Sequence, residues 1–277
     1  MSGRSTRYAV LTAVVVALVV AAAIAIPKLW HATVAHFTAS TCTVGGYEID
    51  TDQASVAAQM VGAVTMHRPR LPARAAVLAL AAALQESKLT NLGPGEGDRD
   101  SVGVLQQRPS QGWGDGDAQR LTDITEATRE FLDALVKVPH WRRLPLAQAV
   151  QAVQISADGS VYAQHEAEAQ ALAAALLGRR AAGITCSYAP PTVVAPARVV
   201  ARMAREQLGI DSPAESRRHV RVPGAGWQTA AWFVANGDRL GIERVAYAGH
   251  VFTREHGWQR APATRRAVVA TMATRST

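Results

Sequence analysis

The segment that most constrains this chain runs from residue 73 to 88, ARAAVLALAAALQESK, with Ala, Leu or Val at most of its positions. Pro72 can open a helix here, and Gly93 with Pro94 breaks the chain after it. A helix that is apolar on every side is typical of the buried centre of an all-α domain. We therefore expect a mainly α domain with this helix at its core.

Helical patterns continue on both sides of that segment. Stretches with apolar residues at helical spacing begin near residues 56, 123 and 146. Asp123 is expected to cap the second of these, with Glu126 completing a capping box. A long Ala-rich helix is expected over 160–177. Together these segments predict one helical domain over residues 31–186.

The pattern changes after a short Pro-rich linker, residues 187–197. Two further helices are expected over 197–208 and 227–240. The stretches IERVAY and HVFTREHGW are typical of two short strands. They predict a small α+β accessory domain over residues 198–277.

The N-terminus carries a run of 19 residues without a charge, Tyr8 to Ile26. As a helix this run would be about 28 Å long, close to the hydrocarbon thickness of a bilayer. Arg4 and Arg7 precede it, which favours a cytoplasmic N-terminus. We expect residues 1–30 to form a cytoplasmic tail and a transmembrane helix that acts as a signal anchor. The rest would then lie outside the cell membrane. A cleaved signal peptide is the alternative.

The chain has two cysteines, Cys42 and Cys186. In an oxidising compartment they are expected to form a disulfide that closes the segment between them. Closing a loop of this size would stabilise the fold by about 4–5 kcal/mol in the chain-entropy model. Two unpaired thiols are the alternative.

The net charge of +7 is unevenly distributed. Residues 1–189 hold 16 Lys and Arg against 16 acids, whereas residues 190–277 hold 13 Arg against 6 acids. Such a basic segment favours polyanions, either nucleic acid, lipid headgroups or wall polymers. The chain has neither an RNA-binding aromatic signature nor zinc-finger spacing, so nucleic acid is not expected as a partner.

Glu86 stands at the end of the apolar helix, in front of a loop rich in Gly and Asp. Apolar surroundings disfavour the ionised form of a carboxyl group, and glycosidic cleavage needs a protonated acid. The following stretch suits a sugar ligand, because Ser101, Gln106 and Gln107 can hydrogen-bond hydroxyl and N-acetyl groups. Trp113 offers a flat face for a pyranose ring.

Two motifs resemble the lysozyme-like lytic transglycosylases, in the form found in exported, anchored cell-wall proteins of Gram-positive bacteria. ALQESKL resembles the catalytic motif, and SVGVLQQRPSQGWG resembles the second motif, S-x-G-[LV]-x-Q. The resemblance covers about residues 55–178 and implies a lysozyme-like fold with Glu86 as the catalytic acid/base. It also implies four residues that support the acid or line the cleft: Ser87, Ser101, Gly103 and Gln106. The family's A-Y-N motif is absent from VQAVQISADGSVYAQHE, where Tyr162 is the candidate replacement.

The reaction could follow either of two routes. A hydrolase, or muramidase, usually needs a second carboxylate. Five loop acids are candidates for it: Glu96, Asp98, Asp100, Asp115 and Asp117. In the family, a transglycosylase uses a single Glu and produces a 1,6-anhydro end. We expect the second route and no cofactor.

The C-terminal stretch GWQTAAWFVANGDRLGIERVAYAGHVFTREHGW resembles a small domain that follows catalytic domains in exported bacterial wall proteins. Related domains often carry a His and an Asp; here only His219 remains, so no catalytic metal is expected. A metal site formed by His219, His250 and His256 is the alternative. Four residues are expected in the core: Trp227, Trp232, Val234 and Trp258.

Together these features predict a membrane-anchored enzyme that cleaves the glycan strands of peptidoglycan and is attracted to anionic wall polymers. One alternative is a catalytically weak or inactive lysozyme-like protein that binds or assembles the cell wall. A purely structural membrane protein would explain the anchor but not the paired motifs.

Overall fold

A computed structural model describes residues 40–156, 158–211, 213–262 and 267–274. The anchor expected over residues 8–26, and with it the segment 1–30, lies outside these ranges. Among the described residues, no helix combines the length and apolarity required to cross a bilayer.

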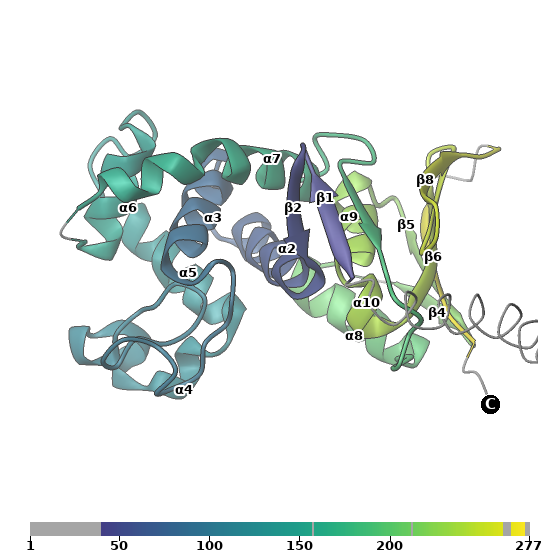
Figure 1. Cartoon of the computed structure of the whole chain (residues 1–277), viewed down its shortest axis with the longest axis horizontal. Coiled ribbons are helices and arrows are strands. Elements are labelled where there is room, and N and C mark those ends of the chain that lie inside the picture. The colour runs from purple at the N-terminus through teal and green to yellow at the C-terminus, as the bar shows by residue number, and fades with distance from the viewer. Residues whose placement is uncertain (1–39, 157, 212, 263–266, 275–277) are drawn as a thin grey trace, which may run out of the picture. The chain divides into compact units, whose positions relative to one another are not determined.

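Helix α3, Arg74–Ser87, is surrounded by other helical elements, and its residues from Ala75 to Leu84 are almost all buried. The elements packed against it are α2 (Thr51–Met66), α5 (Ile124–Leu135), α6 (Leu146–Gln154), η3 (Ser160–His165) and α7 (Glu166–Leu176) (Figure 1). Its small alanine side chains let these neighbours approach closely, which suits a helix without a polar face. The stretch expected to be one helix over 160–177 divides into the 3₁₀ turn η3 and the helix α7.

A three-stranded antiparallel sheet lies beside these helices, in the order β2 (Tyr47–Asp50), β1 (Thr41–Val44) and β3 (Ile184–Ser187). Cys42 of β1 is directly opposite Cys186 of β3, and a disulfide joins them. The bond connects the two ends of the segment that contains α2 to α7.

A six-stranded antiparallel sheet forms the other side of the molecule. Its strands follow the order β4 (Ala214–Ser216), β5 (His219–Pro223), β9 (Ala267–Met272), β6 (Ile242–Tyr247), β7 (His250–Thr253) and β8 (Gly257–Arg260). Between this sheet and α2 lie α8 (Ala197–Leu208) and α9 (Trp227–Ala235), and the short α10 (Gly237–Leu240) follows α9 (Figure 1).

The prediction of a mainly α fold with a small α+β appendage is wrong. The fold is mixed, with 45% helix and 19% strand, and it contains two antiparallel sheets. Six strands were missed, β1 to β5 and β9. Strands β1, β2 and β3 have only four residues each, too few to display the alternation by which strands are recognised.

The helices before β3 and the elements after it share one hydrophobic core, and the structure from residue 40 onward forms one compact unit. Asn236, which is completely buried, links the two parts. Its Oδ1 accepts hydrogen bonds from Ser55 Oγ of α2 and from Arg239 Nε, both at 2.9 Å. The boundaries expected near residues 187 and 198 therefore lie inside a single packed unit.

Gly62 of α2 lies very close to the backbone of α8. A Cβ atom at Gly62 would lie 2.0 Å from the carbonyl oxygen of Gln207. Because that oxygen belongs to the backbone of α8, a larger residue would force the helices apart.

We predict that Gly62→Ala destabilises the protein, although helix propensity alone would favour alanine by about 0.5–1 kcal/mol. Overpacking at the helix contact should outweigh that gain with a net loss of about 2 kcal/mol, lowering Tm by roughly 4–8 °C. Differential scanning calorimetry would measure the shift. Gly226→Ala is the control, because a Cβ there meets no atom within 4 Å. An unchanged or raised Tm in Gly62→Ala would contradict the close contact.

Candidate functional site

Glu86 lies in the last turn of α3, half-buried, where the helix ends after Ser87. The Tyr162 hydroxyl on η3 donates a hydrogen bond to Glu86 Oε1 at 2.6 Å. Tyr162 is only 1% exposed, and its burial, together with the hydrogen bond to Glu86, raises the pKa of its phenol well above the ordinary value of 10. The phenol therefore remains a hydrogen-bond donor to the carboxyl group throughout the neutral pH range.

Ser87 connects the two sequence motifs. Its Oγ donates to the carbonyl oxygen of Val104 at 2.8 Å, which ties the second motif to the end of α3. On the other side, Gln154 Nε2 of α6 donates to the carbonyl oxygen of Leu105 at 2.9 Å. The loop is thus attached to two helices beside Glu86.

The backbone conformation of this loop requires glycine at position 103. Gly103 has a φ of 77°, and its N–H donates to the carbonyl oxygen of Leu92 at 2.7 Å. A Cβ atom at this position would lie 2.2 Å from the carbonyl oxygen of Leu121. Only glycine combines this left-handed conformation with so close an approach of the two backbones.

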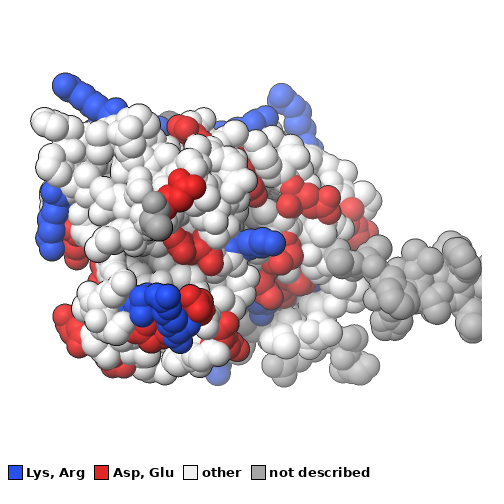
Figure 2. All heavy atoms as spheres, turned by 60° about the vertical axis from the view of Figure 1, so that its left-hand side comes forward, with Lys and Arg blue, Asp and Glu red and all other residues white. Residues whose placement is uncertain are grey.

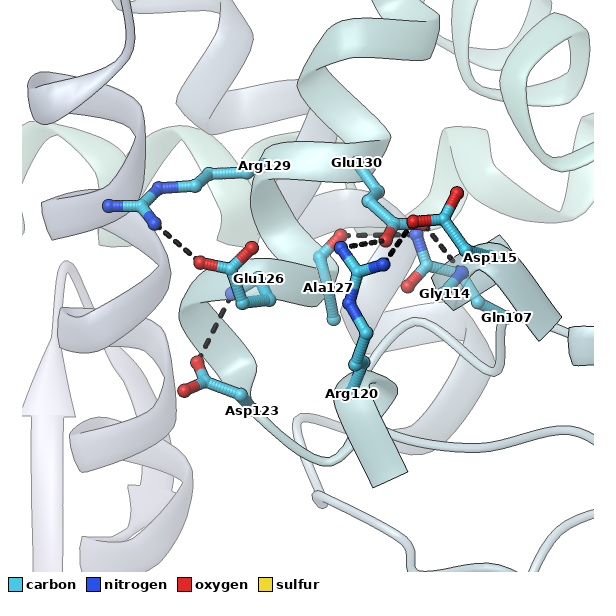
Figure 3. A network of polar contacts seen from close by, with 9 residues as sticks. All are labelled: Gln107, Gly114, Asp115, Arg120, Asp123, Glu126, Ala127, Arg129 and Glu130. Atoms are coloured by element: carbon cyan, nitrogen blue, oxygen red, sulfur yellow. Dashed lines mark hydrogen bonds and ion pairs between the residues drawn. The ribbon is translucent and has the colours of Figure 1, made fainter. Parts of the chain in front are cut away.

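The structure distinguishes Gln106 from Gln107, which the sequence could not do. Gln107 is 2% exposed, and its Nε2 donates to the carbonyl oxygen of Ala127 in α5 at 3.1 Å. Figure 3 shows it among residues of that helix, near the Gly114 N–H that donates to Glu130 at 2.8 Å. Gln106 is half-buried, and its Nε2 donates to the carbonyl oxygen of Gly103 at 2.9 Å. Gln107 therefore holds the loop against α5, while Gln106 is the better candidate for contact with a ligand.

A cleft of about 420 Å³ opens in front of Glu86. Five of the expected site residues border it together: Glu86, Ser101, Gln106, Gln107 and Trp113. The other three, Ser87, Gly103 and Tyr162, support the carboxyl group or the loop without bordering the cleft.

Sequence reasoning missed another part of the cleft border, formed by Gln154, Ile155 and Ser156 at the end of α6. Only their position in the sequence could have indicated them, because these residues lie in the stretch where the family's third motif was sought. Arg99 and Arg108 also border the cleft.

The five acids considered as a second carboxylate have different environments. Asp98 borders the cleft, with its side chain 91% exposed. The other four acids hold loops or helix ends. Glu96 accepts from the Gly93 N–H, Asp115 pairs with Arg120, and Asp117 caps α4 (Ala118–Leu121).

Asp100 is fixed within the loop. It accepts hydrogen bonds from the Ser110 N–H at 2.8 Å and from Arg108 Nε at 2.7 Å. The hydrogen bonds from Ser110, followed by that from Arg108, hold the pKa of Asp100 well below its ordinary value of 3.8. This carboxylate therefore organises the loop, and Asp98 alone among the five has access to the cleft.

The aromatic residues singled out in the C-terminal part pack into the fold. Trp232 and Val234 are buried, and Trp227 lies edge-to-face against Tyr247 and Trp258. The three histidines considered for a metal are distributed over β5, β7 and the turn after β7. Within the described ranges, no group of three or more His, Cys, Asp or Glu residues could hold a metal ion.

No protein-family model matches the chain, and a search of curated proteins found no match.

Proposed function

We propose that this protein cleaves the glycan strands of peptidoglycan, with Glu86 as the general acid and base. The observation that supports this most directly is the Glu86 carboxyl group, held by the buried Tyr162 hydroxyl at 2.6 Å beside a cleft with an indole and several amide side chains. Such a cleft offers stacking and hydrogen-bonding groups to a sugar chain around one oriented acid.

The chemistry can proceed with Glu86 alone. In its protonated form Glu86 gives its proton to the glycosidic oxygen as the bond from that oxygen to C1 breaks. The resulting carboxylate accepts the proton of the C6 hydroxyl of the same sugar while O6 bonds to C1. The products are a 1,6-anhydro end and a reprotonated Glu86. Tyr162 engages only Oε1, and Oε2 has no hydrogen-bond partner among the described residues.

Hydrolysis is the second route for the same site. It would need a base to activate water, and Asp98 is the candidate because it alone among the five loop acids borders the cleft. We favour the transglycosylase route because Asp98 is highly exposed, and the other four acids already have structural partners.

A catalytically inactive wall-binding or assembly protein is the alternative function. The absence of the A-Y-N motif favours it, since the groups that line the cleft would still hold a glycan without cleaving it.

We predict that the full-length protein, purified in detergent, releases 1,6-anhydro muropeptides from isolated peptidoglycan, and that Glu86→Gln releases none. The amide cannot donate the proton that the leaving oxygen needs. Mass spectrometry of the digest would identify the ends. Reducing ends that depend on Glu86 would indicate hydrolysis, and Asp98→Asn would then identify the base. Glycan binding without any release would support the alternative function.

We predict that Tyr162→Phe lowers kcat by about ten- to a hundredfold, the range expected for losing a hydrogen bond to a charged group. KM should change little, because Tyr162 lies behind Glu86 and does not border the cleft. Tyr47→Phe is the matched control, on the exposed strand β2. An unchanged kcat in Tyr162→Phe would remove Tyr162 from the proposed mechanism.

We also propose that the enzyme is anchored in the cell membrane and attracted to anionic wall polymers. The uncharged run over 8–26 supports a membrane anchor, and the 13 arginines against 6 acids after residue 189 support attraction to anionic wall polymers. Acidic and basic side chains are interspersed on the face shown in Figure 2 rather than gathered in one patch. That face therefore does not account for such an attraction.

We predict that binding to isolated cell walls weakens as the salt concentration rises, because screening weakens attraction between exposed charges. A co-sedimentation assay over a salt series would measure it, with Glu86→Gln used to prevent digestion. Binding that does not respond to salt would contradict the electrostatic contribution.

A further inference from the structure

Ile155 combines two unfavourable features. It ends α6 in the left-handed conformation, with φ 53° and ψ 36°, and its N–H donates to the carbonyl oxygen of Gln151. Glycine or asparagine usually occupies this position, because a branched Cβ is strained there. The side chain is also 78% exposed, the highest value among the exposed large apolar residues of the described chain.

Local packing does not account for an isoleucine here. Glycine would end the helix with less strain, and a polar side chain would be better solvated than an aliphatic one. Val193, the next most exposed at 59%, lies in the segment before α8 and has no such backbone strain. Strained residues often occur at binding sites, where the surrounding fold holds a side chain in position for a ligand.

The place of Ile155 points to such a ligand. It borders the cleft that contains Glu86 and Trp113, between the polar neighbours Gln154 and Ser156. Gln154 is itself fixed by its hydrogen bond to the carbonyl oxygen of Leu105. An apolar group between two polar ones complements an acetamide, which has one methyl group beside an N–H and a C=O.

We propose that Ile155 contacts the methyl group of an N-acetyl substituent on a sugar bound in the cleft, and so selects acetylated over deacetylated glycans. This inference rests on the proposed function. The two apolar groups of the cleft then have separate tasks: the flat Trp113 ring suits the face of a pyranose, and the branched Ile155 side chain suits a methyl group.

Two substitutions of Ile155 distinguish its effect on stability from its effect on ligand binding. Ile155→Gly removes both the contact and the strain, so it should raise Tm by about 2–4 °C and weaken binding of N-acetylglucosamine oligomers by about three- to tenfold. Ile155→Ala removes the contact and keeps the left-handed conformation. It should therefore weaken binding similarly without the rise in Tm.

Isothermal titration calorimetry on full-length protein in detergent would test this, with Glu86→Gln as the common background to prevent cleavage. Each variant is titrated with N-acetylglucosamine oligomers and with glucosamine oligomers of the same length. The loss on substitution of Ile155 should be confined to the acetylated ligand. Ala248→Gly is the control for strain, because Ala248 has a φ of 46° in the turn between β6 and β7 and does not border the cleft.

The possible outcomes distinguish a failure of the role of Ile155 from a failure of the proposed function. If the background protein binds the acetylated oligomers and the Ile155 variants bind them equally well, the role of Ile155 is wrong while the proposed function stands. An equal loss for both ligands would overturn the selection of the acetyl group. If the background protein and the wild type bind neither ligand, the proposed function itself fails, and this inference fails with it.

Discussion

The burial of α3 on every side is the constraint on which the rest of the structure depends. A helix without a polar face has to be covered all round, and here four helices and a 3₁₀ turn cover it. The polar residues Gln85, Glu86 and Ser87 are concentrated in its last turn. The same packing that removes the helix from water therefore presents one carboxyl group at its end, at a position that its neighbours define.

Much of this part of the fold could be predicted from local patterns. The long apolar run from residue 73 to 88 identified α3, and the helix expected over 197–208 corresponds to α8. The Asp123 cap was also visible, because a capping residue acts through neighbours two or three positions away. By contrast, the sheet of β1, β2 and β3 depends on the pairing of β1 with β3, which is distant in sequence. A strand of four residues is too short for its sequence pattern to indicate that pairing.

Most residues of the candidate site could be predicted from the sequence, but the role of each residue could not. The motifs indicated Glu86 and the loop from Ser101 to Trp113, and the structure brings them to one cleft. Gln106 and Gln107 have the same side chain, and only the position of α5 decides which of them is buried. Nothing in the sequence singled out Ile155 as part of the cleft. Its left-handed conformation is a property of the folded backbone and cannot be deduced from the identity of a β-branched residue.

The disulfide between β1 and β3 determines how mechanical load would pass through the molecule. The segment enters the fold at β1 and leaves it at β3, and Cys42 and Cys186 are 144 positions apart in sequence. A pulling force applied between residues before Cys42 and residues after Cys186 would pass from one cysteine directly to the other. Helices α2 to α7 and the cleft lie within the closed loop and would carry none of that tension along the chain. Force on the elements after β3 would thus reach the surroundings of Glu86 only through noncovalent packing, such as that of α8 and α9 against α2.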